Sequence, residues 1–160
     1  MKKLFLVLLP VIVLSCGVSS KTQDEDAVTA EKIEKVLKSG NFDIDIRTIY
    51  PQTGPAIFDD GYVFSCKDGK VTTVLPFYGT SNVAVFGSAS SSIELNGEPV
   101  EFTRKAKSPK GSRTLSFSAT MSSGVRWDID IIFWDNGSAD FTCISSSQSP
   151  MRYGGILRLD

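Results

Sequence analysis

Carboxylates are the side chains best suited to acid–base chemistry in this chain, because the sequence contains no histidine. Serine–histidine and cysteine–histidine catalysis are therefore excluded, and the commonest metal ligand is missing. Two carboxylates on one face of a strand lie about 7 Å apart, a separation that suits a glycosidase pair. The candidate pairs are Asp43 and Asp45, Asp59 and Asp60, and Asp128 and Asp130.

Solvated surface positions explain these carboxylates better than catalysis does. Two of the pairs fall on the polar face of alternating segments, next to Arg47 and Arg126. The third pair, followed by Gly61, has the composition of a turn and lacks the further ligands of a calcium loop. We therefore predict no catalytic residue, no metal and no other cofactor, and we keep a carboxylate-dependent hydrolase as the alternative.

Cys66 and Cys143 are predicted to face inward, because they alternate in register with Phe64 and Phe141. In an exported protein a disulfide between them is allowed, provided that their Cα atoms lie within about 7 Å. Two buried thiols are the alternative, and the spacing alone does not decide between them. Two cysteines without histidine do not indicate a zinc site.

Aromatic residues beside proline or glycine form a third candidate group. At the mouth of a barrel they would stack on a sugar or an apolar ligand. They could instead plug the barrel and complete its core, which is the arrangement we favour. The residues are Tyr50, Phe77, Tyr78, Phe86 and Tyr153. Trp134 falls on the outward register, so we expect it under a helix or exposed.

The elements that would position these residues are mostly strands. One helix is predicted at residues 27–38, and Gly40 follows its end. After it, period-two alternation predicts nine or ten antiparallel strands, one of them at residues 82–86. The dipeptides Asp68-Gly69, Asn96-Gly97 and Asn136-Gly137 predict hairpin turns. So many strands must close or stack, which predicts an all-β, antiparallel barrel or flattened barrel with one N-terminal helix.

The N-terminus predicts export and lipidation. Lys2 and Lys3 precede an apolar run that is too short to span a bilayer, and the run ends at Leu14-Ser15-Cys16-Gly17. That tetrapeptide resembles the lipobox of bacterial lipoproteins. The resemblance implies a diacylglycerol on Cys16 and an acyl chain, such as palmitate, on its amine. An ordinary secretory peptide is the alternative.

These features predict the organisation of the chain. Residues 1–15 would be a signal peptide, residues 16–26 a lipidated cysteine with a flexible tether, and residues 27–160 a single helix-plus-barrel domain. We expect the protein in the bacterial cell envelope, anchored by lipid to the outer membrane on its periplasmic face or at the cell surface.

Four short motifs resemble those of a family of Bacteroides-type lipoproteins, known as domain of unknown function 4251. They are Tyr50-Pro51-Gln52-Thr53-Gly54, Leu75-Pro76-Phe77-Tyr78-Gly79, Asn136-Gly137-Ser138-Ala139 and Met151-Arg152-Tyr153-Gly154-Gly155-Ile156. Their order carries the resemblance, which covers most of the chain from the helix onward. It implies a lipocalin-like barrel with an N-terminal helix, and it brings no activity with it. The chain departs from the family pattern at Thr80-Ser81-Asn82, where a longer basic and aromatic stretch is expected.

Charge restricts the partners. The chain has 17 basic and 18 acidic side chains and no basic block, which argues against nucleic acid. We expect a non-catalytic module that is bound to the membrane by its anchor. Its partner would be a small apolar or glycan ligand, or another envelope protein. A structural envelope protein with a filled barrel is a further alternative.

Overall fold

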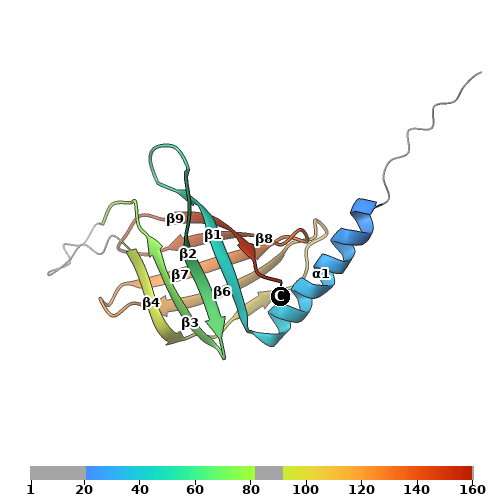
Figure 1. Ribbon diagram of the computed structural model, residues 1–160. Coiled ribbons are helices and arrows are strands. Elements are labelled where there is room, and N and C mark those ends of the chain that lie inside the picture. Colours follow the sequence, from blue (N-terminus) through green and yellow to red (C-terminus); the bar gives the residue numbers. More distant parts are fainter. Residues whose placement is uncertain (1–20, 82–91, 160) are drawn as a thin grey trace, which may run out of the picture.

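The computed structural model describes residues 21–81 and 92–159 (Figure 1). Cys16, Phe86 and the strand predicted at residues 82–86 lie outside the described residues. The described residues form one helix followed by nine strands. They are α1 (Lys21–Ser39), β1 (Phe42–Tyr50), β2 (Ile57–Lys67), β3 (Lys70–Pro76), β4 (Ser92–Pro99), β5 (Thr103–Lys105), β6 (Arg113–Thr120), β7 (Arg126–Phe133), β8 (Ser138–Ile144) and β9 (Met151–Leu157).

All nine strands belong to one antiparallel sheet, in the order β4-β3-β2-β1-β9-β8-β7-β6-β5. The sheet curls until β4, at one edge, contacts β6 near the other edge. The result is a flattened and incompletely closed barrel (Figure 1). This confirms the predicted all-β, antiparallel fold with one N-terminal helix.

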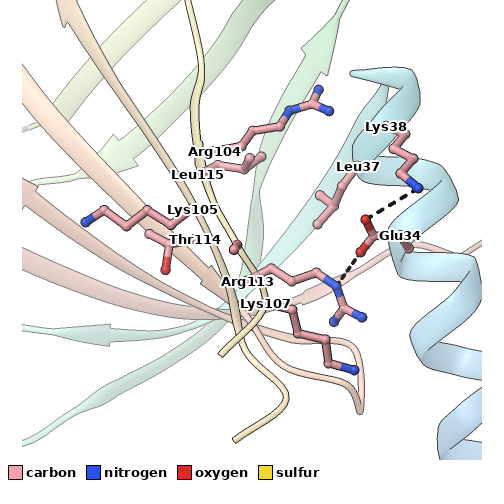
Figure 2. Close-up of a pocket in the computed structure, with 10 residues that line it drawn as sticks. Glu34, Leu37, Lys38, Arg104, Lys105, Lys107, Arg113, Thr114 and Leu115 are labelled. Atoms are coloured by element: carbon pink, nitrogen blue, oxygen red, sulfur yellow. Dashed lines mark hydrogen bonds and ion pairs between the residues drawn. The ribbon is translucent and has the colours of Figure 1, made fainter. Parts of the chain in front are cut away.

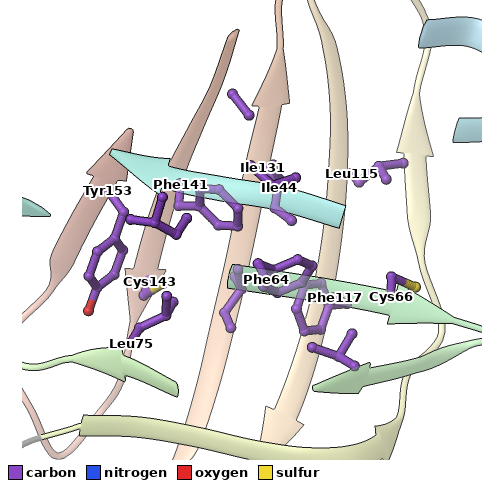
Figure 3. Packing of buried hydrophobic residues seen from close by; sticks show 14 of the residues in the cluster. Ile44, Phe64, Cys66, Leu75, Leu115, Phe117, Ile131, Phe141, Cys143 and Tyr153 are labelled. Atoms are coloured by element: carbon purple, nitrogen blue, oxygen red, sulfur yellow. The ribbon is translucent and has the colours of Figure 1, made fainter. Parts of the chain in front are cut away.

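The alternating apolar residues face inward and fill the barrel. Phe64 lies at the centre, with ring centroids 5.2 Å from Phe141 and 6.0 Å from Phe117. Phe42 packs edge-on against Phe133 at 5.7 Å. These side chains belong to one continuous hydrophobic core (Figure 3). Inward alternation was therefore enough to identify most of the core.

One end of the barrel is closed by two loops. The hydroxyl of Tyr153, a buried residue of β9, donates a hydrogen bond of 2.9 Å to the carbonyl of Pro76 at the end of β3. The next residue, Phe77, packs against Trp127 at 5.9 Å. Thr80 and Ser149 then exchange hydrogen bonds between the two loops. These contacts join the two loops across this end of the barrel.

Two of the three predicted hairpin turns are confirmed, and the third is wrong. Asp68 and Gly69 both have positive φ, 51° and 71°, as a tight hairpin turn requires. Asn96-Gly97 does not turn the chain: β4 runs through it, with Val71 opposite Glu98 and Thr72 opposite Asn96. Gly97, with φ of 75°, is therefore the extra residue of a β-bulge. A glycine with positive φ suits both structures, so the dipeptide alone could not distinguish them.

Helix α1 begins at Lys21, earlier than the predicted residue 27, so residues 21–26 continue the helix. It lies across the other end of the barrel next to β1, and its N-terminal part projects beyond the sheet (Figure 1). Ile33 and Leu37 are buried, whereas Val28 is exposed. Among the described residues, no helix combines the length and apolarity that crossing a bilayer requires.

Candidate functional site

The predicted aromatic residues do not share one mouth. Tyr153 is buried and Phe77 half-buried at the end of the barrel where the two loops meet, whereas Tyr78 is exposed. Tyr50 lies on the outer face of the sheet, because its neighbour Ile49 faces the core. Trp134 also lies outside, half-buried, and its indole Nε1 donates a hydrogen bond of 2.8 Å to Asp140.

The predicted carboxylate pairs lie on the outer surface, and most of them are bound by cations. The Asp45 carboxylate accepts a hydrogen bond of 2.5 Å from Arg158, which lowers its pKa. Asp60 pairs with Arg47 at 2.9 Å. Asp128 and Asp130 line one surface hollow of about 280 Å³ together with Glu101.

That acidic hollow does not provide an enclosed acid–base pair. The Asp128 side chain is 65% exposed, so water surrounds it. General acids with raised pKa values are usually held in apolar surroundings, which this hollow lacks. Across residues 21–81 and 92–159, no cluster of three or more histidine, cysteine or acidic residues is arranged to hold a metal ion.

Cys66 and Cys143 are two separate buried thiols in this structure, on β2 and β8. Figure 3 shows Cys66 toward Leu115 and Cys143 beside Tyr153, in different parts of the core. Burial raises the pKa of both thiols, that of Cys66 to about 11. Neither thiol is therefore suited to act as a nucleophile.

One hollow that brings charged groups together lies between α1 and β5–β6, at the end of the barrel that the helix covers (Figure 2). Its volume is about 430 Å³. Leu37 and Leu115 form an apolar floor. Glu34 and Lys38 come from the helix, and the remaining lining residues are Arg104, Lys105, Ala106, Lys107, Arg113 and Thr114. We call this hollow the basic groove.

Arg113 is the structural centre of the basic groove. It is 8% exposed, and it stands in the inward register of β6 two residues before Leu115. Its Nε donates to Glu34 Oε2 and its Nη1 to Asp135 Oδ1, each at 2.6 Å. These interactions tie α1 to the β7–β8 turn through one guanidinium group.

The pKa values around Arg113 reflect this network. The hydrogen bond from Arg113 lowers the pKa of Glu34. Partial burial opposes ionisation of Asp135, but hydrogen bonds from Lys107 and Arg113 outweigh it and lower the pKa of that carboxyl. Both carboxylates are thus held in their charged form.

Arg104 is a cation of the groove that forms no ion pair with another described residue. It pairs in register with Leu115 and so faces the groove, whereas Lys105 pairs with Thr114 and points away from α1 in Figure 2. Within the described ranges, Arg104 has no carboxylate within ion-pair distance. The groove therefore offers an unpaired guanidinium group above an apolar floor.

Sequence reasoning did not identify the basic groove. Its residues come from α1 and from strands far along the chain, so no local motif contains them. One signal was present: Arg113 stands in register with Leu115, Phe117 and Ala119, where an apolar residue is expected. A charged side chain in the inward register indicates a buried ion pair or a site.

The four motifs that resemble the family meet at β9. Tyr153 bonds to Pro76 of the second motif. Gly154 lies against Tyr50 of the first, since a Cβ at Gly154 would be 3.6 Å from the Tyr50 ring. The amide of Leu157, directly after the fourth motif, donates to the carbonyl of Gly137 in the third at 2.9 Å. The motifs thus stabilise the closure of the fold around β9.

These features define a class: a small protein built on a flattened antiparallel barrel, with a packed interior and one helix across an end. Residues 24–157 match the sequence profile described as "Domain of unknown function (DUF4251)", and the chain belongs to this family. The crystal structure of a DUF4251 family protein from Bacteroides eggerthii DSM 20697 is similar, with a TM-score of 0.59 and 17% sequence identity. The match covers 84% of this chain and 90% of that one. No curated protein matches the chain.

Proposed function

We propose that this protein is a non-catalytic, lipid-anchored binding module of the bacterial cell envelope, and that its basic groove takes a small anionic ligand with an apolar portion. The observation that carries the proposal is Arg104, a guanidinium group without an ion-pair partner in the described chain, facing an apolar floor of Leu37 and Leu115. The volume of the groove lies in the range of small-molecule sites. The packed interior favours a site outside the barrel over one inside it.

A ligand would bind through its anionic group and its apolar portion at once. The guanidinium of Arg104 would donate charge-assisted hydrogen bonds to a carboxylate or phosphate. Arg113 would stay bound to its two carboxylates and keep α1 in place beside the ligand. The floor would bury the apolar portion of the ligand.

Isothermal titration calorimetry with octyl phosphate tests the groove, with octyl glucoside as the neutral probe of the same chain length. We expect octyl phosphate alone to bind. Arg104→Glu should weaken binding by about tenfold to a hundredfold, the equivalent of one hydrogen bond to a charged group. Arg126→Glu is the matched control, because it makes the same charge change at an exposed arginine that does not line the groove. Equal binding of the two probes, or equal effects of the two substitutions, would contradict the proposal.

The anchor has a separate test. Mass spectrometry of the protein purified from bacterial membranes should find Cys16 at the mature N-terminus with a diacylglycerol thioether. A free thiol at Cys16, or cleavage elsewhere, would contradict lipidation and leave the groove experiment unaffected.

A further inference from the structure

The basic groove carries more positive charge than its carboxylates neutralise. Five of its ten described lining residues are cations, and Glu34 alone among these ten is acidic. Arg113 already holds Glu34 at 2.6 Å, and Asp135, outside the lining, pairs with both Arg113 and Lys107. A ligand with a single negative charge would therefore leave part of this surplus uncompensated.

Lys38 is a second cation of the groove that can turn to a ligand. It lies in the last turn of α1, on the wall opposite β5 and Arg104. Its Nζ is 3.7 Å from Glu34 Oε1, and its side chain is 70% exposed. Such an exposed pair contributes little to stability, and Glu34 keeps Arg113 as its closer partner. Lys38 can therefore exchange this contact for a ligand without releasing the helix.

The two cations converge over the apolar floor. Figure 2 shows the guanidinium group of Arg104 extending toward the end of α1 that carries Lys38. Leu37, the residue before Lys38, provides the part of the floor that belongs to the helix. The flexible stem of a lysine lets its ammonium group follow an anion that Arg104 has bound. One anionic group above the floor can thus contact both walls of the groove.

We propose that the ligand of the basic groove is a phosphate monoester, bound as a dianion between Arg104 on β5 and Lys38 on α1. This inference rests on the binding function proposed above and names its ligand class. A phosphate monoester carries close to two negative charges at neutral pH and three acceptor oxygens, which suffice for a guanidinium and an ammonium group at once. A carboxylate or a phosphate diester carries one charge, which Arg104 alone would neutralise.

Isothermal titration calorimetry at about pH 7.5 compares octyl phosphate with methyl octyl phosphate, a diester that keeps the chain and the phosphate but has one charge. We expect the monoester to bind about tenfold more tightly. Lys38→Gln should bring the ratio of the two affinities close to one. Lys35→Gln is the matched control, because it makes the same charge change on α1 at a residue that does not line the groove. It should leave the ratio unchanged.

The pH dependence of binding gives a second readout. The second ionisation of a phosphate monoester lies near pH 6, so octyl phosphate is mostly a monoanion at about pH 5. The chain has no histidine, and the lowered pKa values of Glu34 and Asp135 keep both carboxylates charged at that pH. Octyl phosphate should therefore lose most of its advantage at about pH 5, whereas the affinity of the diester should not change.

Equal binding of the monoester and the diester, or an unchanged ratio in Lys38→Gln, would overturn this inference and leave an anion-binding groove in place. Failure of both esters to bind would contradict the binding function itself, and this inference with it. Glycerol 3-phosphate, a monoester without a long chain, distinguishes the sources of the ligand. Weaker binding than octyl phosphate supports a lipid phosphate monoester, and equal binding supports a soluble one.

Discussion

Replacing Arg113 by methionine is expected to loosen α1 from the barrel and to destabilise the whole domain. Arg113 is the buried cation that joins Glu34 of the helix to Asp135 of the β7–β8 turn, with both contacts at 2.6 Å. Its Nη2 also lies 3.5 Å from the carbonyl of Ala30. Methionine keeps an apolar stem of similar length, so the change removes mainly the charge and its hydrogen bonds.

The size of the effect follows from the exposure of the partners. A hydrogen bond to a charged group contributes about 1.5 to 3 kcal/mol. The side chains of Glu34 and Asp135 are 44% and 31% exposed, so water solvates both carboxylates once Arg113 is gone. The loss in free energy of unfolding should therefore stay near the lower end of this range, at about 2 to 3 kcal/mol for the two contacts together. For a domain of this size, that lowers Tm by about 6 to 12 °C.

Urea unfolding followed by circular dichroism measures this loss as a free energy of unfolding. Arg126→Met is the matched control, because Arg126 and Asp128 form a pair at 3.5 Å whose side chains are 66% and 65% exposed. That substitution should change stability by less than about 0.5 kcal/mol. Similar free energies of unfolding for Arg113→Met and the wild type, or equal losses for the two variants, would refute the reasoning.

Two further predictions concern pH and backbone packing. The pKa of Glu34 is lowered in the folded state, so its contribution to stability is present at neutral pH and is lost as the pH falls below its ordinary value of 4.5. The free energy of unfolding, measured at a series of acidic pH values, should therefore fall less steeply below that pH for Glu34→Gln than for the wild type. Parallel plots of this free energy against pH would contradict the prediction. Gly155→Ala should destabilise by about 2 kcal/mol, because its Cβ would lie 2.6 Å from the carbonyl oxygen of Asp45. Gly154→Ala should not destabilise the protein, because its Cβ would meet nothing closer than 3.6 Å. Thermal unfolding gives the Tm of both alanine variants, and equal Tm values would contradict the packing argument.

Period-two alternation predicted the fold because each strand has one face on the core and one face in solvent. The inward positions of β7 and β8 could be recognised individually, and so could the turn at Asn136-Gly137. The bulge at Gly97 could not, since a positive φ is required in both a hairpin and a bulge. The earlier start of α1 was missed because residues 21–26 are polar, and helix formation there does not depend on an apolar stripe.

Sites are harder to predict than folds in such a protein, because strand pairing brings together residues from distant parts of the chain. The partner of Arg113 on α1 is 79 residues away in the sequence, and Tyr50 meets Gly154 across an even longer separation. Only the order of the strands makes these residues neighbours. Tyr50 was identified as a candidate from its type and flanking proline, but the surface it forms depends on Gly154 leaving space for its ring. The same glycine therefore determines both the packing of β9 against β1 and the position of the Tyr50 ring on the outer face of the sheet.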